Sequence, residues 1–136
     1  MKDLIYKNNK HEEFYFLNKT ENDVYRNALI YLVGLTEDTR NHFSEILTNE
    51  GINLNVLHSG WITGETRRLL ILGFNLYNGY MYESEGSKND IDLNTVSEIF
   101  SGELAYYYLQ AIDIRFDVYK NERKRIELYK NFGLED

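Results

Sequence analysis

The residues best suited to chemistry lie in the stretch GLTEDTRNHFSEIL, where Asp38, Arg40 and His42 fall within five positions. Asp38 and His42 are four residues apart, so on a helix they would share a face, and the carboxylate could orient the imidazole as a general base. No nucleophile stands near them in the sequence. Thr36 and the two acids after it have the composition of a helix start, because a hydroxyl caps free N–H groups and acids complement the helix dipole. We interpret the segment as a capped helix and expect no catalytic residue in it.

Arg40 is predicted to lie half toward the core, and Arg68 lies on the polar stripe of a later predicted helix. Together with His42, these side chains either pair with buried acids or bind an external anion near a helix start. For Arg40, structural pairing is the stronger interpretation. An enzymatic alternative stays open, in which the fold assembles a site from Arg40, His42, Arg68 and Asp113.

Metal and cofactor sites find little support in the sequence. The histidines, His11, His42 and His58, never occur four residues apart, and the chain has no cysteine to assist them. The glycines of GWITGET are not followed by the Lys-Ser/Thr pair that completes a phosphate-binding loop. We therefore expect neither a metal site nor a cofactor.

Residues suited to binding a partner occur in three places. Trp61, the only tryptophan, stands in a glycine-flanked predicted turn, where it either fills the core or anchors a partner. Tyr106, Gln110 and Asp113 share one face of a predicted helix, so the tyrosine should be exposed beside polar groups. The third place is a polar predicted loop with four acidic side chains, Glu83, Glu85, Asp90 and Asp92.

Acidic and basic residues are unevenly distributed along the 136 residues. The formal net charge is −7, which repels phosphate backbones and disfavours direct nucleic-acid binding. Residues 81–104 hold six acids and one lysine, a local net charge of −5, whereas residues 120–130 have a local net charge of +3. The acidic segment could imitate phosphates and occupy a nucleic-acid channel in a target protein.

The sequence contains no segment suited to targeting or membrane insertion. Its N-terminal residues lack an apolar run of signal-peptide length, and the longest apolar stretch, residues 69–77, is too short to span a bilayer. The absence of cysteine agrees with a reducing compartment. We expect a cytoplasmic protein without membrane contact.

Apolar residues recur every three or four positions along most of the chain, and no proline interrupts them, which predicts helices. The predicted helices span residues 10–18, 20–34, 36–51, 63–79, 95–100 and 103–119. Leu17 of the first and Tyr119 of the last are expected on the buried side. Residues 52–57 alternate like a strand, but a single strand has no partner, so we expect an irregular connection with room for one helical turn.

The predicted architecture is one compact all-α domain of five or six helices over residues 1–136. Residues 69–77 are apolar nearly all round and should form the central helix. Residues 120–136 either continue the last helix or form a charged tail.

Three segments carry a resemblance to a known family: ALIYLVGLTEDTRNHF, GWITGETRRLLILGFNLYNGY and TVSEIFSGELAYYYLQAIDIRF. Over most of residues 24–117 they resemble an uncharacterised family of small proteins encoded by phages and prophages of low-GC Gram-positive bacteria. The 12 tyrosines and the absence of proline agree with an AT-rich gene. The basic segment after Tyr119 looks longer than the family usually has. The resemblance implies a mobile-element gene and no particular activity.

These observations favour a binding protein over an enzyme. A small, acidic, helical protein of phage type would act by occluding a host protein, and an inhibitor of a bacterial defence system, such as an anti-CRISPR protein, fits that description. A structural, morphogenetic or regulatory phage component is the second hypothesis. It predicts a stable oligomer, and the helix over residues 103–119 offers a face for a homodimer.

Overall fold

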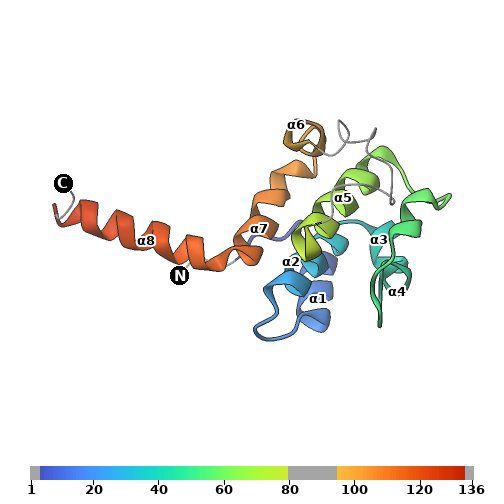
Figure 1. Ribbon diagram of the computed structural model, residues 1–136, viewed down its shortest axis with the longest axis horizontal. Helices are drawn as coiled ribbons and strands as arrows, with labels where there is room; N and C mark the ends of the chain where they lie inside the picture. The colour runs from blue at the N-terminus through green and yellow to red at the C-terminus, as the bar shows by residue number, and fades with distance from the viewer. Residues whose placement is uncertain (1–3, 80–94, 134–136) are drawn as a thin grey trace.

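The computed structural model describes residues 4–79 and 95–133, which fold mainly into helices (Figure 1). The elements in chain order are α1 (Asn9–Asn18), α2 (Val24–Val33), α3 (Glu37–Asn41), α4 (Phe43–Ile46), β1 (Leu47–Thr48), β2 (Gly51–Ile52), the 3₁₀ helix η1 (Leu54–His58), α5 (Gly64–Asn78), α6 (Val96–Ile99), α7 (Ala105–Arg115) and α8 (Asp117–Asn131). The predicted all-α fold is therefore confirmed. Within the described part of the chain, no helix is both long enough and apolar enough to cross a bilayer.

The core is built around α2, whose residues 27–33 are all buried. Helices α1, α5 and α7 pack against it. Residues 69–74 of α5 are buried, as the sequence predicted, but the central helix is α2 and not α5. A Cβ atom at Gly73 would lie 2.7 Å from Cδ1 of Leu29. Leu29 of α2 therefore packs directly over Gly73 of α5, and a larger residue at this position would force the Leu29 side chain to move.

The predicted helix over residues 36–51 is divided into α3 and α4, with the break at His42. The expected capping is present, because the Thr36 side chain accepts a hydrogen bond from the N–H of Thr39 at 3.0 Å. The buried hydroxyl of Thr39 in turn donates to the carbonyl oxygen of Val33 at 2.6 Å. This bond holds α3 against the end of α2. The chain then turns at His42, and Ile46 of α4 is buried in the core.

Residues 52–57 form the expected connection with one helical turn, and within this range only Ile52 belongs to a strand. Strand β2 pairs antiparallel with β1, Leu47 opposite Ile52 and Thr48 opposite Gly51. The partner strand comes from residues predicted as helix, which is why sequence periodicity did not indicate it. The expected helical turn is present as η1.

Two residues expected to be buried are exposed. Leu17 is 83% exposed because α1 buries His11 and Tyr15 instead. Tyr119 is 65% exposed, because the predicted last helix breaks at Phe116, where ψ is 48°. The chain then continues as α8, which leaves the body of the molecule (Figure 1).

His11 is a fully buried polar side chain between α1 and α2. Its Nδ1 accepts a hydrogen bond from the N–H of Lys7 at 3.0 Å, so Nε2 carries the proton and donates to the carbonyl oxygen of Tyr31 at 2.7 Å. Aromatic rings surround it, that of Tyr31 at 4.5 Å and that of Tyr6 at 5.4 Å between centroids. Burial lowers the pKa of His11 from 6.5 to about 4, because the neutral ring satisfies both hydrogen bonds and a charged ring would lose solvation.

We predict that His11 makes the free energy of unfolding fall as the pH drops from 6.5 to 4. In this window the unfolded chain binds a proton that the folded chain excludes, so the stabilisation present above pH 6.5 is lost by pH 4. The expected loss is about 3 kcal/mol. Urea unfolding of the wild type and His11→Gln across this range measures it, because the carboxylates titrate in both proteins. Equal pH slopes in the two proteins would contradict the assignment.

Candidate functional site

An apolar groove of about 600 Å³ lies between α5, α6 and α7. Helix α5 forms one wall, α6 forms the second, and α7 with its C-cap forms the third. The lining residues are Ile71, Leu72, Asn75, Leu76, Val96, Ile99, Phe100, Leu109, Ile112 and Phe116. Asn75 is the only polar residue among them, so the groove suits an apolar guest and offers little to a charged one.

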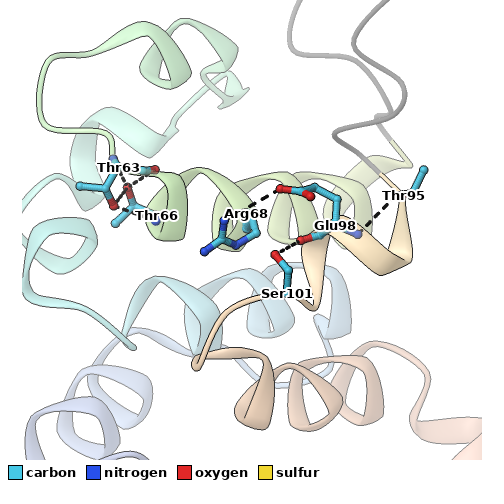
Figure 2. A network of polar contacts seen from close by, with 6 residues as sticks. All are labelled: Thr63, Thr66, Arg68, Thr95, Glu98 and Ser101. Carbon is cyan, nitrogen blue, oxygen red and sulfur yellow. Dashed lines mark hydrogen bonds and ion pairs between the residues drawn. The ribbon is translucent and has the colours of Figure 1, made fainter.

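The wall formed by α6 is a single helical turn that polar contacts hold in place. The Thr95 hydroxyl caps the start of α6 by accepting a hydrogen bond from the N–H of Glu98 at 3.3 Å. At the other end, the Ser101 hydroxyl donates to the Glu98 carbonyl oxygen at 2.7 Å. Figure 2 shows Arg68 reaching from α5 toward the Glu98 carboxylate, with Nη1 and Oε1 4.0 Å apart.

Arg68 also fixes the turn that follows α6. A Cβ atom at Gly102 would lie 2.8 Å from its Nη2, so the guanidinium lies directly against this backbone. Its Nε is buried without a hydrogen-bond partner in the described residues. Arg68 is therefore a structural clamp between α5 and the start of α7, which agrees with the structural interpretation of its role.

The rim of the groove exposes large apolar side chains. Val96 is 73% exposed and Leu109 is 61% exposed, on opposite walls. Tyr106, one turn before Leu109 on α7, is 78% exposed, as the sequence predicted. Apolar side chains that cluster around a groove on the surface of a protein are typical of an interaction site.

The other residues predicted to bind a partner do not join Tyr106 in one exposed patch. The Gln110 side-chain oxygen accepts a hydrogen bond from the N–H of Ile5 at 3.2 Å, so it anchors the N-terminal segment. Asp113 is half-buried on the same helix. The four predicted acidic partner-binding residues, Glu83, Glu85, Asp90 and Asp92, lie outside the described residues.

His42 and Trp61 stack on each other, with ring centroids 4.1 Å apart and planes 10° apart. The Nδ1 atom of His42 is 2.7 Å from the main-chain carbonyl oxygen of Asp38. This bond goes to the backbone, so the Asp38 carboxylate does not orient the imidazole. The other ring nitrogen, Nε2, lies 3.7 Å from Oε2 of Glu45. Trp61 is half-buried against the core, and its Nε1 is enclosed without a partner among the described residues.

Arg40 donates from Nη1 to the carbonyl oxygen of Gly34 at 2.7 Å. It thereby satisfies a carbonyl at the C-terminal end of α2, where the helix itself supplies no partner. Arg40, His42 and Arg68 thus each contact a different neighbour, and no described contact joins any two of them. No group of three His, Cys, Asp or Glu side chains suited to a metal ion occurs among residues 4–79 and 95–133.

Arg115, which sequence reasoning did not single out, contacts the main chain of Leu76, one of the residues that line the groove. Its Nε donates to the Leu76 carbonyl oxygen at 2.8 Å, and its guanidinium carbon lies 3.8 Å from the centroid of the Tyr25 ring. The side chain therefore joins the ends of α5 and α7 to α2. The sequence did not indicate this role, because the predicted helix continues to residue 119, whereas in the structure Arg115 is the last residue of α7.

We predict that Arg115→Ala lowers the free energy of unfolding by about 2–3 kcal/mol. The substitution removes a charged hydrogen bond and a cation–π contact. Urea unfolding followed by circular dichroism measures the change. Lys130→Ala on exposed α8 is the matched control and should change the value by less than about 0.5 kcal/mol. Equal stability of the two variants would contradict a clamping role for Arg115.

Comparison with known proteins identifies a family. The sequence model of a family of unknown function, DUF6075, matches residues 1–128. No curated protein and no solved structure gives a significant match. The matched range includes most of α8, so most of the basic segment after Tyr119 lies within the family and is not an extension beyond it. Because the match covers nearly the whole chain, the protein belongs to this family, DUF6075.

Proposed function

We propose that this protein acts by binding a host protein through the groove between α5, α6 and α7. The observation that carries the proposal is the groove itself, an apolar surface with Val96 and Leu109 exposed on its rim. Covering such a surface is favourable by about 25 cal/mol per Å² of apolar area removed from water.

The chemistry of the groove indicates the kind of segment that it binds. Three helices contribute the lining of the groove, and the lining is apolar. Such a surface suits the apolar face of an amphipathic helix. Among the described residues here, Glu98 on the α6 wall and Glu103 just before α7 are acidic. A partner helix with basic residues beside its apolar face is therefore the best complement.

The proposal extends to the biological role. The protein would be encoded by a phage or prophage of a low-GC Gram-positive bacterium and would act in the host cytoplasm as an inhibitor of a defence system, such as an anti-CRISPR protein. Support comes from the resemblance described above and from the net charge of −7. An acidic surface suits a protein that blocks a channel for nucleic acid.

The groove is tested with Leu109→Glu, which places a charge on its rim. We expect tagged wild-type protein to capture a host protein from lysate of a low-GC Gram-positive bacterium, and Leu109→Glu to bind the purified partner at least about 10-fold more weakly. Leu17→Glu is the matched control, because Leu17 is 83% exposed on α1, outside the groove, and should bind like the wild type.

A second variant, Val96→Glu, tests the opposite wall and should have the same effect as Leu109→Glu. Circular dichroism should show that all three variants remain folded, since each changed side chain is more than half exposed. A partner that binds both groove variants as tightly as the wild type would overturn the proposal.

Phosphate imitation is tested separately by reversing the four acids Glu83, Glu85, Asp90 and Asp92 to lysine. If they imitate phosphates, the reversal abolishes binding to the partner, and added salt weakens the wild-type complex. The biological readout is the plating efficiency of a phage on a host with an active defence system, which the wild type should raise and the reversed variant should not. Unchanged binding would end the imitation hypothesis and leave the groove proposal standing.

A further inference from the structure

Helix α8 leaves the body of the molecule (Figure 1) and exposes an unusual amount of apolar surface. Its main packing contacts are with α7. Six large apolar side chains on α8 and its C-cap are 44–70% exposed: Val118, Tyr119, Ile126, Leu128, Tyr129 and Phe132. Exposing this much apolar surface to water is unfavourable, and such a surface is typical of a site that binds a partner.

The positions of these side chains follow a heptad repeat. Val118, Glu122, Arg125, Tyr129 and Phe132 are spaced alternately by four and three residues, which is the spacing of the a and d positions in a two-stranded coiled coil. The other exposed apolar residues fall at the flanking e and g positions. Every b, c and f position of α8 holds a charged or amide residue in the sequence. The pattern is therefore that of a helix that packs against one other helix.

The centre of this a/d seam is charged. Glu122 and Arg125 lie there and form an ion pair with each other within the helix, while Val118, Tyr129 and Phe132 give the seam apolar ends. In a parallel pair of α8 helices, Glu122 would face Glu122 and Arg125 would face Arg125. In an antiparallel pair with Val118 opposite Tyr129, each Glu122 faces the Arg125 of the other copy. The seam is thus self-complementary about a two-fold axis only when the helices run antiparallel.

We propose that α8 pairs antiparallel with α8 of a second copy of this chain and makes the protein a homodimer. The start of α8 is held in place by the end of α7, where Arg115 binds the Leu76 carbonyl oxygen and the Tyr25 ring. An isolated helix of 15 residues is marginally stable in water. Here α7 and the second copy both support α8. The charged centre of the seam lowers the affinity between the two copies, because its charges lose water when the helices pair. It also sets the register and the antiparallel direction of the two helices.

The dimer proposal is independent of the proposed function. None of the a and d residues of α8 lines the groove between α5, α6 and α7. Groove variants such as Leu109→Glu should therefore leave the dimer intact, and α8 variants should leave the groove unchanged. Failure of one proposal is distinguishable from failure of the other.

The test is a charge swap in the full chain, with mass measured by light scattering and sedimentation at concentrations up to about 200 μM, where micromolar pairs are populated. The wild type should have twice the 16.2 kDa mass of one chain. Glu122→Arg and Arg125→Glu, each made alone, should weaken the dimer at least about 10-fold, because two facing attractions become repulsions. The double variant should restore it, and a mixture of the two single variants should form a heterodimer.

Glu13→Arg is the matched control, because Glu13 is exposed on α1, outside the α8 seam, and it should dimerise like the wild type. Circular dichroism shows whether α8 stays helical in each variant. A wild type that is monomeric throughout the concentration range would overturn the proposal. So would a dimer that both single reversals leave unchanged.

The direction of the helices is tested with cysteines, which the chain lacks. Mild oxidation of Val118→Cys mixed with Tyr129→Cys should produce a disulfide-linked dimer, because the two positions face each other in the antiparallel register. Val118→Cys alone should remain largely uncrosslinked. Efficient crosslinking of Val118→Cys to itself, without crosslinking to Tyr129→Cys, would indicate a parallel pair and overturn the proposal.

Discussion

The crossing of α2 and α5 at Gly73 is the constraint on which the rest of the structure depends. The absent side chain lets Leu29 approach within 2.7 Å of where a Cβ atom would lie, so the two most buried helices share one interface. Because α2 is buried along residues 27–33, α1 and α7 also pack against it, and α6 packs against α5. The side of α5 that does not face α2 then forms a wall of the groove through Leu72 and Leu76.

Most polar side chains that could do chemistry stabilise the ends of helices instead. Arg40 binds the Gly34 carbonyl oxygen and Arg115 binds the Leu76 carbonyl oxygen. His11 binds the backbone on both of its ring nitrogens. Carbonyl groups near the end of a helix have no partner within it, and leaving them buried and unpaired is costly. These side chains therefore serve the fold, and the apolar surfaces are left as the features most suited to recognition.

The two apolar surfaces of the molecule differ in kind. The groove is a concave surface assembled from three helices, and it has almost no charge in its lining. The seam of α8 is a convex surface on one helix with an acid and a base at its centre. A concave apolar site accepts any segment with a suitable apolar face, whereas a charged seam selects its own register. A protein that recognises another through the first surface can thus assemble with itself through the second.

The sequence by itself determined the helical class, the burial of residues 69–74 and the capped start at Thr36, because hydrophobic period and capping depend only on neighbouring residues. It also indicated the exposure of Tyr106. Only the tertiary structure decided the break at Phe116, the pairing of β1 with β2, and the roles of Arg68 and Arg115. The pairing of Leu47 with Ile52 is local, but the helical spacing of the residues around β1 hid it. The roles of Arg68 and Arg115 arise from contacts between residues far apart in the chain, as when Arg115 reaches Leu76, and local periodicity does not report such contacts. The groove has the same origin, since its walls meet only after α5, α6 and α7 have packed together.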